Sequence, residues 1–254
     1  MNQGIIEAHE AGVVTSASVL VNLPAFDDAV RCALRAPALG TGLHFNILLG
    51  RPLTHAVTLT DTASGAFLPL AALARRAFTG RVDHQEVRSE CAAQIARMRS
   101  GGLRVTHLDS HRHAHALPVV WPAVVAAARD AGVPVVRVPL EPFGINPGTA
   151  VVEKLALLAS WRVASRGSPA VRRPDRFVGI SLMGGRHFAA RLARLLEAPV
   201  TGSTELMVHP GYDDAELARL DPYRQARELE LAALTSASVR RALERFERVD
   251  FAGL

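Results

Sequence analysis

The segment THLDSHRHAHALP carries four of the chain's ten histidines together with one aspartate. Side chains two apart point to the same side of an extended chain. The residues that would share one face for as long as the chain stays extended are His107, Asp109, His111, His113 and His115. A solvent-facing loop explains any single histidine more simply, but four imidazoles beside a carboxylate favour a divalent-metal or catalytic site.

Two further histidines follow apolar segments that are typical of strands. His44 lies in GTGLHFN, and His209 lies in ELMVHPGYDD. Because the carboxyl ends of parallel strands meet at one edge, His44, His111 and His209 are predicted to converge there. His44 and His111 could supply two metal ligands, yet no acidic residue at the end of an early strand completes the set.

Strand-like and helix-like segments alternate along the chain, which predicts a parallel α/β architecture, either a barrel or a doubly wound sheet. The predicted strands are Val14–Val21, Leu39–Phe45, Arg104–Ser110, Pro134–Val138, Phe177–Leu182, Glu205–His209 and Arg248–Phe251. The predicted helices are Gln3–Glu10, Pro24–Leu34, Pro69–Phe78, Gln85–Met98, Pro118–Ala131, Val151–Ser165, Arg186–Leu196, Tyr223–Thr235 and Ser238–Glu244. Seven strands are one fewer than a closed eight-stranded barrel needs.

Composition narrows the class of protein. The 254 residues, 49% of them hydrophobic, predict one domain over residues 1–254. The chain has neither an apolar run of 18 residues nor a secretory leader pattern, so we expect a cytoplasmic protein without a membrane span. The net charge of +5 comes from scattered arginines, which disfavours nucleic-acid binding. The G-x-S-x-G, phosphate-loop and H-E-x-x-H motifs are also absent.

Five stretches in order resemble the YdjC/ChbG-like carbohydrate deacetylases, the family of the chitooligosaccharide deacetylase. They are NQGIIEAHEAGVVTSASVLVN, GLHFNILLGRPLT, THLDSHRHAHALP, ELMVHPGY and RELELAALTSASVRRAL. The resemblance covers the chain nearly end to end and is weakest over residues 141–176. It implies an irregular (β/α) barrel of the TIM type and removal of the acetyl group from N-acetylated sugars.

The resemblance also implies roles for individual residues. His44 and His111 match the metal-binding histidines, and Asp109 matches a carboxylate that either supports the ligands or acts in catalysis. His209 matches a general acid for the leaving amine, and His113 and His115 would line the sugar cleft or support the ligands. One divalent ion is implied, Mg²⁺ by family resemblance, with Zn²⁺ as the alternative that imidazole ligands favour.

Family members open with a strand that ends in an Asp-Asp motif, and no position of this sequence matches it. We therefore expect a domain that lacks its first strand, with an open seam in the barrel. Two alternatives to an active deacetylase stay open: a catalytically impaired sugar-binding relative, and another metal-dependent hydrolase such as a phosphoesterase. The expected partner is an N-acetylated sugar, and a homodimer is a reasonable expectation.

Overall fold

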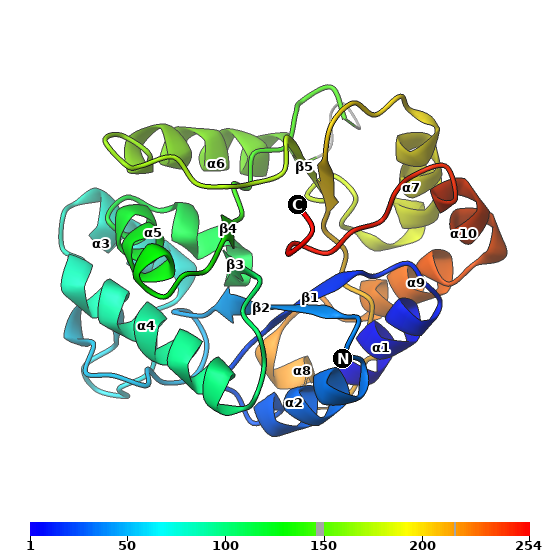
Figure 1. Cartoon of the computed structure of the whole chain (residues 1–254). Coiled ribbons are helices and arrows are strands. Elements are labelled where there is room, and N and C mark those ends of the chain that lie inside the picture. The colour runs from blue at the N-terminus through cyan, green and yellow to red at the C-terminus, as the bar shows by residue number, and fades with distance from the viewer. Residues whose placement is uncertain (146–149, 216) are drawn as a thin grey trace.

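The computed structural model describes residues 1–145, 150–215 and 217–254, and a parallel sheet of four strands lies at its centre. The strands are β1 (Ser16–Val19), β2 (Gly40–Phe45), β3 (His107–Ser110) and β4 (Val135–Val136). They lie side by side in the order β1-β2-β3-β4, and Figure 1 shows helices around them. All three pairings are parallel, which confirms the predicted α/β class.

A second, smaller sheet pairs β5 (Arg176–Val178) with β6 (Thr204–Leu206), again in parallel. A single bridge between Val135 and Arg172 links the segment before β5 to the first sheet. The strands predicted over 177–182 and 205–209 are therefore present but shorter. Within the described ranges the two sheets do not join into one closed sheet, so the barrel stays a prediction.

The nine predicted helices are confirmed, with ends within two residues of the prediction. They are α1 (Asn2–Glu10), α2 (Phe26–Arg35), α3 (Leu70–Phe78), α4 (His84–Ser100), α5 (Val120–Asp130), α6 (Val151–Ala164), α7 (Phe188–Glu197), α9 (Gln225–Leu234) and α10 (Ala237–Leu243). The short α8 (Leu217–Leu220) and the 3-10 turns η1 (Val57–Leu59), η2 (His111–Ala116) and η3 (Gly185–His187) were not predicted. None of the helices in the described residues is long and apolar enough to cross a membrane.

The main core lies between the first sheet and the helices α4 and α5. Leu43 and Leu108 are opposite each other in register and fully buried. Met98 of α4 and Trp121 of α5 belong to the same cluster and are also buried. Because β2 and β3 are anchored on this core, the residues at their carboxyl ends have a rigid support.

The strand predicted over Arg248–Phe251 is wrong, because these residues have no regular secondary structure. The Arg248 guanidinium donates to the carbonyl of Gly12, and the Phe251 ring stacks on His107 with 4.0 Å between centroids. The segment is therefore attached by side chains instead of by a strand ladder. Figure 1 shows this C-terminal segment running into the middle of the molecule.

The extended chain that would place the histidine run on one face ends at Ser110, where the predicted strand also ends. The strand β3 ends there, and η2 contains two successive residues with left-handed backbone, Arg112 at φ 51° and His113 at φ 56°. Such angles are uncommon for residues other than glycine and reverse the direction of the chain. The histidines after Ser110 consequently lie in different surroundings: His111 and His113 line a cavity, and His115 is fully buried.

Candidate active site

The candidate site lies at the carboxyl ends of β2 and β3, where His44 and Asp109 are partners in register. The His44 Nδ1 lies 2.7 Å from Oδ1 of Asp109. Burial alone would raise the pKa of Asp109, but Arg137 and His44 hold it well below its ordinary value. Because an ionised carboxylate only accepts, His44 donates through Nδ1, and Nε2 is the ring nitrogen left for another partner.

His111, the first residue after β3, lies beside His44. The centroids of the two rings are 5.8 Å apart and the rings meet edge to face. Burial, with a smaller contribution from His44, lowers the pKa of His111 to about 4, so the ring is neutral near pH 7. The structure therefore brings together the two histidines that were predicted as metal ligands.

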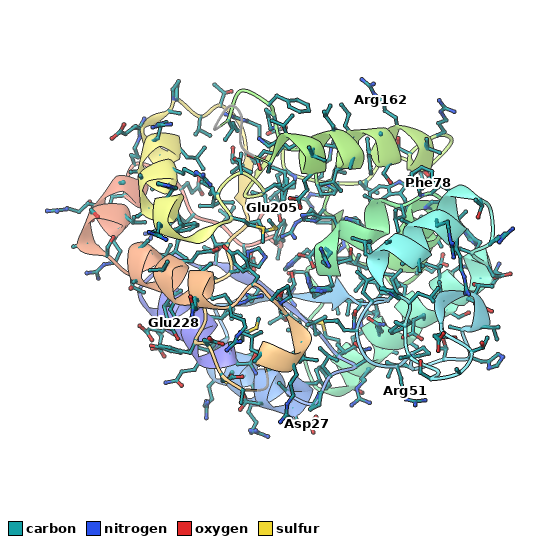
Figure 2. The ribbon with its side chains drawn as sticks, turned by 180° about the vertical axis from the view of Figure 1, so that it is seen from behind. Asp27, Arg51, Phe78, Arg162, Glu205 and Glu228 are labelled. Carbon is teal, nitrogen blue, oxygen red and sulfur yellow. The ribbon has the colours of Figure 1, made fainter. Side chains whose placement is uncertain are left out.

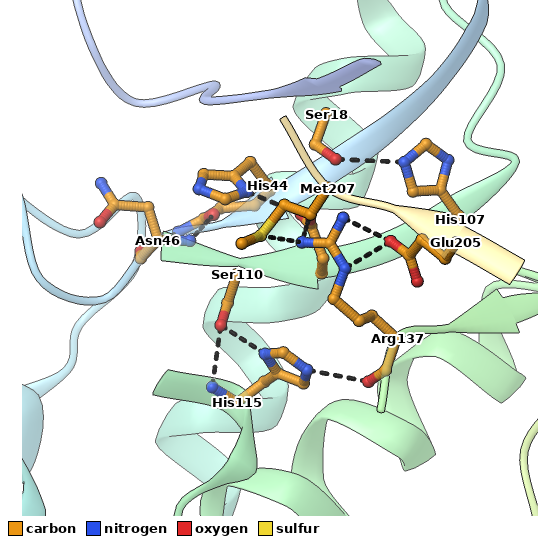
Figure 3. Close-up of polar contacts among 11 residues, drawn as sticks. Ser18, His44, Asn46, His107, Ser110, His115, Arg137, Glu205 and Met207 are labelled. Carbon is orange, nitrogen blue, oxygen red and sulfur yellow. Dashed lines mark hydrogen bonds and ion pairs between the residues drawn. The ribbon is translucent and has the colours of Figure 1, made fainter. Parts of the chain in front are cut away.

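A buried arginine stands behind Asp109. Arg137 directly follows β4, its Nη1 pairs with Oδ2 of Asp109, and its Nη2 lies 2.5 Å from Oε1 of Glu205 on β6. Figure 2 places Glu205 near the centre of the molecule, whereas Arg51, Arg162 and Glu228 lie toward its periphery. Burial raises the pKa of Glu205, and the charge of Arg137 opposes that rise. The result is a connected series of charged groups from β3 to β6 (Figure 3).

His115 is fully buried, and both of its ring nitrogens have protein partners. Its Nδ1 lies 2.5 Å from Oγ of Ser110, and its Nε2 donates to the carbonyl of Arg137 at 2.9 Å. Burial lowers the pKa of His115 to about 4. These contacts leave no ring nitrogen of His115 for a sugar. Of the two roles predicted for His115, lining the sugar cleft or supporting the ligands, they favour the second.

His113 is 8% exposed and packs edge-on against Phe177, with 5.7 Å between centroids. Burial lowers its pKa well below the ordinary value, and the Arg137 charge contributes. Its Nδ1 has no hydrogen-bond partner among the described residues. His113 thus differs from His115 in keeping an uncommitted donor or acceptor next to the cavity.

His209, which follows β6, is half-buried and lies against Tyr223, with 5.6 Å between ring centroids. The backbone N–H of His209 donates to Glu230 at 2.5 Å, and the Tyr223 hydroxyl donates to the same carboxylate. Burial, followed by the charge of Arg227, lowers the pKa of His209 to about 3. The Nδ1 of His209 has no partner within the described part of the chain.

One cavity of about 1810 Å³ collects most of these groups. The predicted site residues that line it are His44, Asp109, His111, His113 and His209, and Arg137 and Glu205 line it as well. His107 lines it too, but its ring nitrogens contact Ser18 and Thr106, 3.1 and 3.0 Å away. The cavity is large enough for a small-molecule ligand.

The donor chemistry fits a metal ion only in part. His44 and His111 are adjacent imidazoles, which suit a divalent transition metal. However, no group of three or more His, Cys, Asp or Glu side chains in residues 1–145, 150–215 and 217–254 is arranged to hold an ion. Asp109 cannot easily complete the set, because both of its oxygens are engaged by His44 and Arg137. These residues therefore form at most part of a metal site.

Comparison with known proteins assigns the family. The family model for YdjC-like protein matches residues 1–245. The chain belongs to the YdjC-like family. A crystal structure of a candidate cellobiose-phosphate cleavage protein from Enterococcus faecalis V583 has a TM-score of 0.76 and 28% identity, covering 96% of this chain and 88% of that one. The resemblance inferred from the five motifs is confirmed.

Several curated relatives of this YdjC-like chain are named carbohydrate deacetylase. The protein from Brevibacillus brevis is 31% identical over 100% of this chain and 94% of its own length. The protein from Geobacillus stearothermophilus is 35% identical over 94% of this chain and 85% of its own. The human protein is 37% identical over 83% of this chain and 70% of its own.

Arg137 and Glu205 are the residues of this YdjC-like site that the sequence pattern did not predict. Arg137 follows the apolar strand VPVV, and Glu205 opens the segment ELMV. A charged residue at the end of an apolar strand is the same signal that identified His44 and His209. If the criterion of a polar residue at a strand end had included arginine as well as histidine and aspartate, it would have identified Arg137.

Proposed function

We propose that this chain is a carbohydrate deacetylase, a hydrolase that cleaves the acetamide of an N-acetylated sugar and releases acetate. Chitooligosaccharides and other sugars that contain N-acetylglucosamine are the proposed substrates. The name shared by the relatives from Brevibacillus brevis, Geobacillus stearothermophilus and human supports the reaction class. We further propose a cytoplasmic protein, one irregular (β/α) barrel formed by the single domain, and a homodimer.

The observation that carries the proposal is the His44–Asp109–His111 cluster at one rim of the parallel sheet. The buried, ionised Asp109 orients His44 through Nδ1, so that Nε2 is available beside the neutral ring of His111. Active sites of α/β barrels lie at the carboxyl ends of the strands, and a carboxylate commonly orients a histidine there, as Asp109 does His44. The cavity next to them can admit a sugar.

We also propose one divalent ion, Mg²⁺ or Zn²⁺, with His44 and His111 as its ligands from this chain. Such an ion would polarise the acetamide carbonyl and acidify a bound water when present. No third side-chain ligand is arranged among the described residues, so we route no step of the reaction through the ion. Dialysis against a chelator, followed by metal analysis and titration calorimetry with Zn²⁺ and Mg²⁺, tests this part directly.

The chain's own groups suggest how protons move. Burial lowers the pKa of His209 to about 3, so the ring is neutral near pH 7 and must first accept the proton that the attacking water loses before it can donate one to the leaving amine. Asp109 is poorly placed to accept that proton, since its two oxygens already contact His44 and Arg137. This favours an orienting role for Asp109. His113, which lines the cavity and whose buried Nδ1 has no partner among the described residues, is the proposed contact for the sugar.

Acetate release from a panel of N-acetylated sugars tests the proposal, with and without added Zn²⁺ or Mg²⁺. We expect the unmodified chain to release acetate, and we expect His44→Ala and His111→Ala to abolish this release. The matched control is His55→Ala, because His55 is exposed and does not line the cavity. Unchanged release in His44→Ala would contradict the assigned site.

A catalytically impaired sugar-binding protein is the second candidate, and the incomplete ligand set favours it. In that case calorimetry with N-acetylglucosamine oligomers would show binding, while no acetate would appear at any metal concentration. Binding that is weakened by His113→Ala would place the sugar in the same cavity.

A further inference from the structure

Arg137 connects the two sheets at the level of the candidate site. Its Nη2 and Nε lie 2.5 and 2.6 Å from Oε1 of Glu205, while Nη1 pairs with Oδ2 of Asp109. The guanidinium carbon also lies 5.3 Å above the Phe177 ring, and Nη1 is 3.7 Å from Sδ of Met207. The guanidinium therefore has a fixed plane, set by contacts from β3, β5 and β6.

The main chain of Arg137 is held as firmly as its side chain. Its N–H donates to Leu108 at 2.9 Å, and its carbonyl accepts from Nε2 of His115 at 2.9 Å. His115 is in turn fixed by Ser110, whose Oγ contacts Nδ1 and also accepts the backbone N–H of His115 at 2.9 Å. The supports on both sides of Arg137 come from β3 and η2, the segments that carry Asp109 and His111.

We propose that Arg137, seated on Glu205, is a positioning residue that fixes Asp109 as the acceptor for the Nδ1–H of His44, so that His44 presents Nε2 to the cavity. The series His44–Asp109–Arg137–Glu205 runs from β2 through β3 to β6. Figure 3 shows the contacts between Arg137 and Glu205. This inference rests on the proposed function for its consequence in catalysis. Its geometric part, the tautomer of His44, holds whether or not the chain is active.

The chemistry of the guanidinium explains why arginine occupies this position. Asp109 and Glu205 approach it from different sides, and only a planar fork with several N–H donors can hold both at once. A lysine ammonium is a point charge on a flexible stem and would keep one carboxylate at the expense of the other. Asp109 would then be free to rotate, and His44 would lose its fixed acceptor.

A purely structural role makes a different prediction. If Arg137 only offset the buried charges of Asp109 and Glu205, its replacement would lower stability and leave His44 unchanged in the molecules that remain folded. The two interpretations separate in the tautomer of His44 and in the balance between kcat and KM.

The test uses Arg137→Lys and Glu205→Gln in the full chain. ¹⁵N NMR of histidine-labelled protein reports which ring nitrogen of His44 carries the hydrogen, with the His44 signals assigned by their loss in His44→Ala. We expect Nδ1–H in the parent and a mixture of tautomers in Arg137→Lys. In acetate release we expect kcat to fall by about 10- to 100-fold with KM unchanged. Glu205→Gln should produce the same changes to a smaller extent.

Lys154→Met is the matched control, since Lys154 forms a buried ion pair with Glu141 at 3.1 Å and does not line the cavity. It should lower stability and leave the His44 tautomer and kcat as in the parent.

A parent-like His44 tautomer in folded Arg137→Lys overturns the proposal. If Arg137→Lys does not fold, a parent-like tautomer in Glu205→Gln overturns it instead. Absence of acetate release by the parent contradicts the proposed function alone, because the NMR result still decides the positioning role.

Discussion

Two buried ionic clusters in this molecule each pair a cationic side chain with carboxylates, but the carboxylates contact different groups beyond the pair. In one, Arg137 joins Asp109 to Glu205, and the series ends at His44, whose Nε2 is open to the cavity. In the other, Lys154 pairs with Glu141 at 3.1 Å, and that carboxylate accepts the backbone N–H groups of Gly179 and Ser181. The first cluster ends at a reactive group, and the second ends at the main chain and at the hydroxyl of Ser181.

The difference teaches how to interpret a buried charge. A cluster that ends on peptide groups is complete within the fold, and its contribution is to hold segments together, here α6 and the residues after β5. A cluster that ends on an imidazole with one uncommitted nitrogen transmits its rigidity to a group that can bind or react. Substitutions in the two clusters should therefore affect different measurements.

The largest expected effect is on stability, in Lys154→Met. Removing the ammonium leaves the Glu141 carboxylate buried without its counter-charge, and the remaining donors, two backbone N–H groups and the Ser181 hydroxyl, offset only part of the cost. We expect a loss of about 3–5 kcal/mol in the free energy of unfolding, measured by urea denaturation. Acetate release per folded molecule should not change. A stable variant with reduced kcat would contradict the comparison.

The next effect is the dependence of stability on pH. Burial lowers the pKa of His115 to about 4 from its ordinary value of 6.5, so the folded state binds this proton less readily than the unfolded state. The stabilising contribution is complete above pH 6.5 and is lost as the pH falls from 6.5 to 4. It amounts to roughly 3 kcal/mol.

His115→Gln tests this pH dependence, because glutamine cannot titrate and its amide can still donate to the carbonyl of Arg137. Urea denaturation between pH 7 and pH 4 should show a shallower decline for the variant than for the parent. The matched control is His55→Gln, since His55 is exposed, and it should decline as the parent does. If the free energy of unfolding declined equally with pH in the parent and in His115→Gln, protonation of His115 would not be a cause of the decline.

The sequence predicted the parts of this site that depend on one segment at a time. His44 and His209 were found as polar residues at the ends of apolar strands, and Asp109 and His111 were found in the histidine-rich run that ends a third strand. Parallel strands bring such ends together. The shared face ends at Ser110, and the left-handed backbone at Arg112 and His113 that follows has no glycine in the sequence to indicate it. This turn separates His113, beside the cavity, from His115, inside the core.

The pairing of Arg137 with Glu205 could not be predicted in the same way. The two residues are 68 positions apart and belong to different sheets, so their contact depends on how β6 packs against β4. The strand predicted at Arg248–Phe251 failed for a related reason. A short segment forms a strand only where a neighbouring sheet edge accepts it, and in RVDF, half of which is charged, Phe251 stacks on His107 instead.

Asp109→Asn should give the third effect, this time on activity. In asparagine an NH₂ group, which only donates, replaces one of the two carboxylate oxygens that accept from His44 and Arg137. One of the two contacts is therefore lost. We expect kcat for acetate release to fall by about 10- to 100-fold. Glu141→Gln, the equivalent change in the other cluster, should leave kcat unaltered, and a similar fall there would remove the distinction between the clusters.

The smallest effect is expected where an ion pair is in contact with water. Arg88 Nη2 lies 2.6 Å from Oδ2 of Asp130, closer than Lys154 lies to Glu141, but the two side chains are 41% and 48% exposed. Solvent screens the attraction between these partly exposed charges, so Arg88→Met should cost only about 0.2–1 kcal/mol in urea denaturation. A loss as large as that of Lys154→Met would mean that the short distance, and not burial, sets the cost. In that case the contrast between the clusters could no longer be argued from the surroundings of their charges.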